Sequence, residues 1–301
     1  MTPPDRPARA GWAADPAVTE RLLEVETEDG VLLPGCVLAP RRAAASTCVL
    51  WLHGFGMSYD YGPYLGIGRA VAATGTAFAS VAVRGYHGAV TAWRQTPDRL
   101  RTTRAGSWYE VFGESELDIA AWLGAARSAG YATVVLAGHS FGAIKALHYL
   151  ARRGGPVEGL ILASPSLGLT RLEPGILARA RDLVARGAGR ELLPPGSWPG
   201  GFGTDTVSAQ TYASWSPAAD LVFGPGASWP ASIRCPVLAF YGDSGDLGAR
   251  AELDFFTGRM TAAPAETAML PGLAHNYLDG QATVAAAIST WIGRSELRWS
   301  A

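Results

Sequence analysis

The chain has 301 residues, of which 48% are hydrophobic and 17% charged, and its formal net charge is −1. Because the chain has no surplus of basic residues to neutralise phosphates, this composition argues against a nucleic acid as the partner. No stretch approaches the ~18 consecutive apolar residues of a transmembrane helix, so we expect no membrane span.

The N-terminal residues and the cysteines indicate the compartment. Residues 1–20 are expected to form a flexible N-terminus, and residues 1–15 are rich in proline and arginine without the apolar region of a signal peptide. The three cysteines, Cys36, Cys48 and Cys235, lie in expected strands or begin one and have no CxxC spacing. We therefore expect buried free thiols and a cytoplasmic location.

Apolar runs that alternate with helical patterns predict the fold class. The expected strands are Leu22–Thr27, Val31–Leu38, Thr47–Leu52, Ala77–Val83, Thr133–Ala137, Val157–Ser164, Val237–Tyr241 and one near Thr267–Leu270. The expected helices are Tyr64–Ala73, Glu114–Ser128, Phe141–Arg152 and Gln281–Ile292. This alternation predicts an α/β fold with a doubly wound, mostly parallel sheet and an antiparallel hairpin at one edge.

Two long segments interrupt the alternation. Residues 84–113 are polar and rich in glycine, so we expect a loop without regular structure. Residues 166–234 show no strand pattern and are too long for a simple connection, which predicts an inserted lid of short helices. The core domain would then comprise residues 21–165 and 235–301. We call residues 166–234 the inserted segment.

The sequence Gly138-His139-Ser140-Phe141-Gly142 is a GxSxG motif between an expected buried strand and an expected helix. Nucleophilic serines of hydrolases lie on such a strand-to-helix turn, where glycines permit a tight bend and the hydroxyl is exposed at the sheet edge. The alternative is an ordinary turn whose serine caps the helix. The context favours Ser140 as a nucleophile.

A nucleophilic serine needs a histidine base. Of the five histidines, His53 and His87 lie in loops, His139 adjoins the serine, and His148 lies on the helix behind it. His275 follows the last strand, where a base can reach Ser140, although a solvated loop histidine is the simpler alternative. We therefore expect His275 to be the base.

The acid that orients the base should follow the strand Val237–Tyr241, and two aspartates do so. Asp243 comes almost directly after the strand and is also suited to forming a turn beside glycine. Asp246 is placed to return over the sheet edge toward His275, so we favour Asp246 while Asp243 remains the alternative. An oxyanion needs two backbone donors, and we expect the N–H groups of Phe141 and Phe55.

Ser140, Asp246 and His275 in this chain order, with the His53-Gly54-Phe55-Gly56 loop after the third strand, resemble the α/β-hydrolase superfamily. The resemblance extends from about Leu22 to Ile292 and includes the lid after the sixth strand. It implies the α/β-hydrolase fold and a serine esterase or thioesterase activity.

The stretch from His53 to Lys145 is similar to a less-characterised esterase-like branch that carries an Arg-Gly motif after the fourth strand, here Arg84-Gly85. The acid loop departs from the family's usual Gly-x-x-Asp by one additional residue. Asp243 therefore remains a candidate acid.

Aromatic residues concentrate in the long loop and the inserted segment. Trp198 and Trp215 are candidates for an apolar substrate pocket, although they could equally form the core of the lid. We expect a hydrolase without metal or cofactor that cleaves an ester, thioester or amide of a small molecule with a bulky apolar or aromatic part. The alternatives are an acyltransferase or cyclising thioesterase with the same acyl-enzyme, and a non-catalytic binder of the same fold. The oligomeric state is not predicted.

Overall fold

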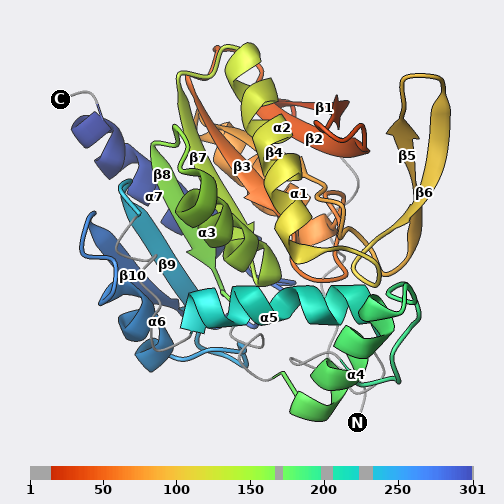
Figure 1. Ribbon diagram of the computed structural model, residues 1–301. Coiled ribbons are helices and arrows are strands. Elements are labelled where there is room, and N and C mark those ends of the chain that lie inside the picture. The colour runs from red at the N-terminus through yellow and green to blue at the C-terminus, as the bar shows by residue number, and fades with distance from the viewer. Residues whose placement is uncertain (1–14, 167–171, 198–205, 224–232, 300–301) are drawn as a thin grey trace, which may run out of the picture.

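The computed structural model describes residues 15–166, 172–197, 206–223 and 233–299, and a large sheet lies at its centre (Figure 1). Its order is β1-β2-β4-β3-β7-β8-β9-β10. The strands are β1 (Val18–Glu26), β2 (Leu32–Pro40), β3 (Thr47–Leu52), β4 (Ala77–Val81), β7 (Thr133–His139), β8 (Gly159–Ala163), β9 (Val237–Gly242) and β10 (Ala265–Leu270).

Strand pairing confirms the predicted architecture. β2 pairs antiparallel with β1 and with β4, whereas the remaining pairs of this sheet are parallel. Every residue of β3, β4, β8 and β9 is buried, which explains why these strands appear in the sequence as continuous apolar runs. Because parallel strands end at the same edge, the loops after β3, β7, β9 and β10 can meet there.

Helices cover both faces of the sheet. α1 (Gly62–Ala73) and α7 (Gln281–Trp299) pack on one face, where Ile67 and Ile288 are buried in the same cluster. α2 (Ser115–Ser128) and α3 (Phe141–Arg153) cover the other face. A shorter helix, α6 (Arg250–Thr257), packs beside β9 and β10.

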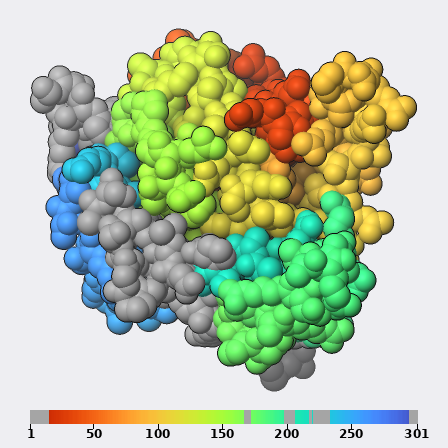
Figure 2. All heavy atoms as spheres, viewed as in Figure 1, coloured from red at the N-terminus to blue at the C-terminus, as the bar shows by residue number. Residues whose placement is uncertain are grey.

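The prediction that residues 84–113 form a loop without regular structure was wrong. Part of this stretch is a β-hairpin of β5 (Val90–Gln95) and β6 (Leu100–Ala105), and the 3-10 helix η1 (Phe112–Glu114) follows it. Figures 1 and 2 show the hairpin standing out from the body. Its side chains are mostly exposed, so the strands lack the apolar runs that mark the central sheet. Thr96 closes the turn, since its backbone N–H and its hydroxyl both donate to the Arg99 carbonyl.

The inserted segment contains α4 (Pro174–Ala185) and α5 (Ala209–Phe223), which lie across one end of the sheet (Figure 1). Pro174 occupies the first helical turn of α4, and the Glu173 carboxylate accepts hydrogen bonds from the N–H groups of Gly175 and Ile176. α5 packs against α4, η1 and α3. In the described part of the chain, no helix combines the length and apolarity needed to cross a membrane.

Candidate active site

Ser140 lies on a sharp turn between β7 and α3. Its φ of 54° and ψ of −116° are unusual for a residue with a side chain, and such strain concentrates at functional sites. The flanking glycines are required by close packing: a Cβ on Gly142 would lie 2.5 Å from the His53 carbonyl oxygen, and one on Gly138 would overlap the backbone of Gly142. The GxSxG sequence therefore forms the expected strand-to-helix turn.

The structure brings the predicted nucleophile, base and acid together. His275 Nε2 lies 3.0 Å from Ser140 Oγ, and His275 Nδ1 lies 2.7 Å from Asp246 Oδ1. The Asp246 side chain is fully buried, whereas 13% of the His275 side chain is exposed. This geometry allows His275 to accept the Ser140 proton while Asp246 holds the imidazole.

Asp246 is held as a carboxylate by its hydrogen bonds. Oδ2 accepts from the Ser164 hydroxyl at 2.5 Å and from the Gly242 N–H at 2.7 Å. Because Ser164 donates its only proton to Asp246, the Tyr277 hydroxyl at 2.6 Å must donate to Ser164. Burial acts to raise the pKa of Asp246, but the bonds from His275, Ser164 and Gly242 outweigh it and keep this pKa below its usual value.

Asp243 has a different position. Its Oδ1 accepts the Gly272 N–H at 2.6 Å, and its own N–H donates to the Leu270 carbonyl. It therefore ties the end of β9 to the turn after β10, and among the described residues Asp246 is the carboxylate that contacts His275. The additional residue in the acid loop leaves Asp246 in reach of the base.

The loop after β3 packs directly against the nucleophile turn. A Cβ on Gly54 would lie 3.1 Å from Ser140 Cβ, and the rings of Phe55 and Phe141 make an edge contact with centroids 6.1 Å apart. Both residues expected to supply oxyanion donors are therefore neighbours of Ser140.

A buried hydrogen-bond chain, absent from the sequence-based expectations, joins this loop to the backbone of His275. The Gly54 N–H donates to the Tyr64 hydroxyl at 3.2 Å, and Tyr64 is 2.7 Å from His139 Nδ1. His139 Nε2 is 2.8 Å from the His275 carbonyl oxygen, which can only accept, so Nε2 carries the proton and Tyr64 donates to Nδ1. Burial and, to a smaller extent, the nearby His275 lower the pKa of His139 to about 3, so its ring is neutral.

His53 holds the carbonyl group of the same glycine, Gly54. Its Nε2 accepts the Val83 N–H at 3.1 Å, so its Nδ1 donates to the Gly54 carbonyl at 2.8 Å. Burial lowers the pKa of His53 to about 3. Neither histidine nor Tyr64 shows a local pattern that predicts this role.

A cavity of about 360 Å³ opens above Ser140 and His275. Its large apolar lining residues are Phe55, Met57, Trp108 and Leu247. Trp198, a predicted substrate contact, lies outside the described residues.

Trp215, the other predicted substrate contact, is fully buried in α5. It packs edge-on against Phe55 and Phe141, with ring centroids 6.0 and 5.9 Å apart, and it is not part of the cavity lining. Trp215 therefore supports the loop and the helix that adjoin Ser140, whereas Trp108 faces the cavity.

The motif Arg84-Gly85 also has a structural explanation. The Arg84 guanidinium is buried and forms an ion pair of 2.7 Å with Asp118 on α2. A Cβ on Gly85 would overlap the Glu110 carboxylate, which is buried and paired with Lys145 at 2.5 Å. The motif thus fixes the segment between β4 and the hairpin.

Comparisons with known proteins agree with this fold. The model of the Alpha/beta hydrolase family matches residues 49–287. A highly thermostable carboxyl esterase from Bacillus coagulans is 17% identical, with a TM-score of 0.69 over 91% of this chain and 98% of the other. None of the curated proteins matches the chain.

Two further solved structures are similar. Est1E from Butyrivibrio proteoclasticus with bound ferulic acid is 15% identical, with a TM-score of 0.65 over 91% of this chain and 99% of that one. A soluble variant of monoglyceride lipase from Saccharomyces cerevisiae, in complex with a substrate analogue, is 15% identical with a TM-score of 0.64, covering 90% and 94% of the two chains. At these identities the likeness concerns the fold.

Proposed function

The chain is a hydrolase of the alpha/beta hydrolase family, and we propose that it cleaves carboxylic esters of small molecules through an acyl-enzyme on Ser140. The observation that carries this proposal is the continuous contact from Ser140 Oγ to His275 Nε2 and from His275 Nδ1 to Asp246. A serine with a base and an oriented carboxylate is the arrangement that acyl transfer requires.

In the proposed reaction, Ser140 Oγ attacks the carbonyl carbon while its proton passes to His275 Nε2. The tetrahedral oxyanion is stabilised by the N–H groups of Phe55 and Phe141, and the ionised Asp246 stabilises the imidazolium. The C–O bond to the alcohol then breaks, and His275 gives the leaving oxygen its proton. Water repeats the sequence on the acyl-enzyme, releasing the acid and restoring Ser140.

The proposed acyl group is bulky and apolar or aromatic. Phe55, Met57, Trp108 and Leu247 offer apolar surface beside the nucleophile, and a cavity of about 360 Å³ has the size of a small-molecule site. That Est1E, a protein of the same fold, has been solved with ferulic acid is compatible with an aromatic acyl group. Thioesters and amides of such acids are included in the proposal because they react through the same acyl-enzyme.

The test is covalent labelling followed by turnover. A fluorophosphonate probe should add one label to the wild-type chain, detected by intact mass, and none to Ser140→Ala. Ser107→Ala is the matched control, since Ser107 lines the same cavity and its buried hydroxyl has no hydrogen-bond partner in the described residues. Labelling of another residue while Ser140 stays unmodified would overturn the proposal.

The same preparations should hydrolyse a panel of p-nitrophenyl esters and acyl thioesters with a transient acyl-enzyme mass. An acyltransferase or cyclising thioesterase would form that mass but pass the acyl group to an added alcohol or amine faster than to water. The ratio of hydrolysis to transfer distinguishes these activities, and a predominance of transfer would replace the hydrolase proposal. A non-catalytic binder would show neither label nor acyl mass.

A further inference from the structure

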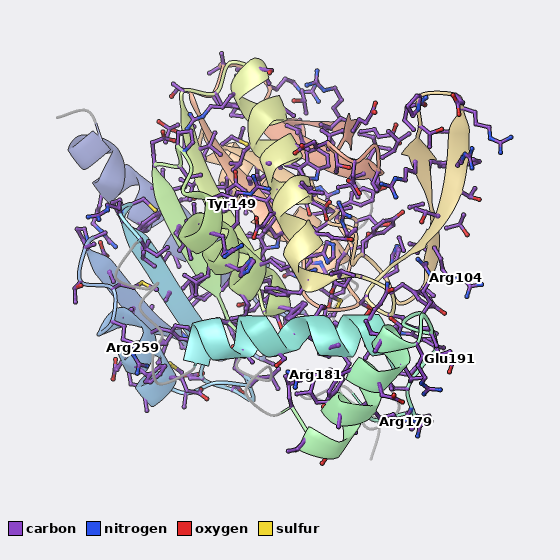
Figure 3. All side chains as sticks on the ribbon, in the orientation of Figure 1. Arg104, Tyr149, Arg179, Arg181, Glu191 and Arg259 are labelled. Atoms are coloured by element: carbon purple, nitrogen blue, oxygen red, sulfur yellow. The ribbon has the colours of Figure 1, made fainter. Side chains whose placement is uncertain are left out.

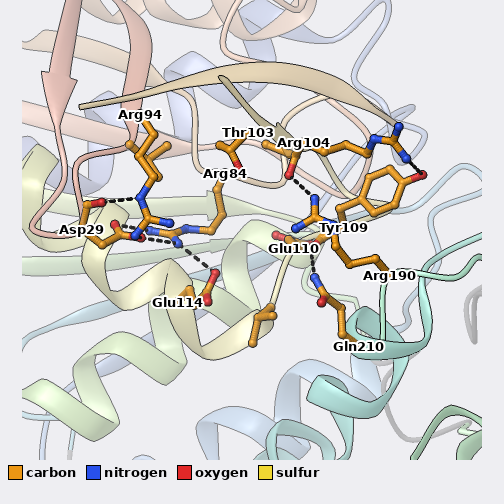
Figure 4. Close-up of a pocket in the computed structure, with 13 residues that line it drawn as sticks. Asp29, Arg84, Arg94, Thr103, Arg104, Tyr109, Glu110, Glu114, Arg190 and Gln210 are labelled. Atoms are coloured by element: carbon orange, nitrogen blue, oxygen red, sulfur yellow. Dashed lines mark hydrogen bonds and ion pairs between the residues drawn. The ribbon is translucent and has the colours of Figure 1, made fainter. Parts of the chain in front are cut away.

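A second cavity, of about 230 Å³, lies where the hairpin, the start of α2 and the inserted segment meet (Figure 4). It shares no lining residue with the cavity above Ser140. Four arginines and three carboxylates line it, and most of them are paired with one another. The arginines are Arg84, Arg94, Arg104 and Arg190.

The inner part of this cavity is internally neutralised. Arg84 bonds Asp29 at 3.1 Å and Glu114 at 2.9 Å, in addition to its buried pair with Asp118. Arg94 forms a second contact with Asp29 at 3.4 Å. The third lining carboxylate, Glu110, is paired with Lys145. Each carboxylate of the cavity therefore already has a cationic partner.

Arg104 and Arg190 differ from the other two arginines, because neither has a carboxylate partner among the described residues. Both guanidinium groups lie over the Tyr109 ring, with centroid distances of 5.3 and 5.4 Å. Arg190 Nη2 also donates to the Arg104 carbonyl oxygen at 2.8 Å. In Figure 3, Arg104 lies at the base of the hairpin, near the part of the inserted segment that contains Glu191.

These contacts hold two guanidinium groups beside the Tyr109 ring, at residues that line the cavity, before any ligand arrives, and Arg104 Nη1 also lies 3.5 Å from the Tyr109 hydroxyl. A guanidinium that is already oriented loses less conformational freedom on binding an oxyanion than a free surface arginine does. Its planar set of N–H donors matches the two oxygens of a carboxylate or phosphate. The same wall includes Arg94, which is bonded to Asp29, and Gln210, whose amide donates to the Tyr109 carbonyl at 2.8 Å.

We propose that this cavity is a second binding site, for a small molecule that carries a carboxylate or phosphate group, and that Arg104 and Arg190 bind the anionic group. The ligand would connect three parts of the chain. It would contact the hairpin through Arg104, the inserted segment through Arg190, and the segment between the hairpin and α2 through Tyr109.

The site also adjoins the candidate active site. Ser107 and Trp108 line the cavity above Ser140, whereas the next two residues, Tyr109 and Glu110, line the second cavity. The backbone carbonyl of Trp108 accepts from Ser208 N–H at 2.7 Å, so the inserted segment is fastened to this shared wall. A ligand beside Tyr109 should therefore reduce the motion of residues 107–110.

The experiment measures binding of inorganic phosphate, succinate and citrate to the full chain by calorimetry, with ionic strength held constant by NaCl. We expect saturable binding of at least one of these anions. The anion that binds most tightly shows whether the ligand carries a phosphate or a carboxylate group. Arg104→Gln and Arg190→Gln should each raise the Kd about tenfold or more, since each removes charge-assisted hydrogen bonds. Arg42→Gln, an equal change of charge at an exposed position outside the cavity, should leave the Kd unchanged.

Localisation and folding complete the test. Hydrogen exchange should slow at residues 103–110 and 189–191 when the anion is bound, while α7 on the far face of the sheet stays unchanged. Arg190→Lys keeps the charge but lacks the planar set of N–H donors, so it should bind the anion with intermediate affinity. Its melting temperature without ligand should equal that of the wild type.

Absence of saturable binding, an equal effect of NaCl alone, or an equal loss in Arg42→Gln would overturn the proposal. Persistence of binding in Ser140→Ala, together with its loss in Arg190→Gln, separates this site from the active site. The readout does not depend on turnover, so failure of the proposed ester hydrolysis would not be mistaken for failure here.

Discussion

Replacing Asp246 with asparagine should abolish most of the activity by reversing the tautomer of His275. One Asp246 oxygen faces His275 Nδ1 at 2.7 Å, and the other accepts from Ser164 and Gly242. Oδ1 also accepts the Leu247 N–H at 2.7 Å, so an asparagine, which has one acceptor oxygen, cannot serve both pairs of donors. The tautomer changes in the orientation that keeps this oxygen on Ser164 and Gly242. The asparagine NH₂ group would then face His275 Nδ1, which must become an acceptor, so that the ring proton moves to Nε2.

A protonated Nε2 cannot accept the proton of Ser140, so the expected loss is large. The corresponding substitution in a serine protease lowers kcat by about 10⁴-fold through the same change of tautomer. We expect a loss of the same order here, which equals about 5 kcal/mol of transition-state stabilisation. The assay is kcat/KM for p-nitrophenyl butyrate, with circular dichroism to show that the variant is folded.

Asp243→Asn is the matched control for this prediction. The Asp243 carboxylate accepts one N–H, that of Gly272, and an asparagine oxygen can accept the same bond. We expect a loss of less than about fivefold, the equivalent of one ordinary hydrogen bond of about 1 kcal/mol. Equal losses in the two variants, or a larger loss at position 243, would refute the assignment of the acid.

Three further predictions concern stability and packing. In the unfolded chain His139 takes up a proton below about pH 6.5, whereas burial keeps its pKa in the folded protein at about 3. The stability that neutral His139 contributes is therefore complete above about pH 6.5, and it decreases by about 1.4 kcal/mol per pH unit as the pH falls toward 3. Urea unfolding of His139→Gln at pH 7, 6 and 5 should show a pH dependence that is shallower by this amount, and an unchanged slope would contradict the argument. Gly85→Ala should destabilise the fold by about 2–4 kcal/mol because its Cβ overlaps the buried Glu110 carboxylate, whereas Gly113→Ala, which enters open space, should change the melting temperature little. Trp215→Ala should lower kcat/KM by a similar factor for acetyl and aromatic acyl esters, since the ring packs against Phe55 and Phe141, the proposed oxyanion donors. A selective rise in KM for large acyl groups would instead make Trp215 a substrate contact.

The central sheet could be predicted because its strands are buried on both faces, so that burial alone produces the apolar runs. The hairpin could not, because it is a two-stranded ribbon whose residues are mostly solvated and include Arg94, Arg101 and Arg104. Its one strong signal is the Pro97-Asp98 turn, where Thr96 and Arg99 are hydrogen-bonded. Polarity therefore indicated exposure correctly, but exposure does not exclude a strand.

The site divides in the same manner. The positions of Ser140, His275 and Asp246 follow from which loops leave the same edge of a parallel sheet, and chain order carries that information. Tyr64 and Ser164 contribute through contacts with residues 75 and 82 positions away, His139 and Asp246. No local pattern marks a tyrosine or a serine for such a contact, so these residues become evident only from the packed structure.

The hydrogen-bond partners explain why, among the histidines around Ser140, His275 has the properties of a base. In His53 and His139 both ring nitrogens are engaged by backbone groups or by a tyrosine, and burial keeps both rings neutral. A ring in that state can position a loop but cannot take up a proton without breaking a bond and charging a buried group. His275 alone among these three combines a carboxylate on Nδ1, a serine hydroxyl on Nε2 and partial exposure to the cavity. The two neutral histidines hold the loops beside Ser140, which leaves His275 as the proposed base.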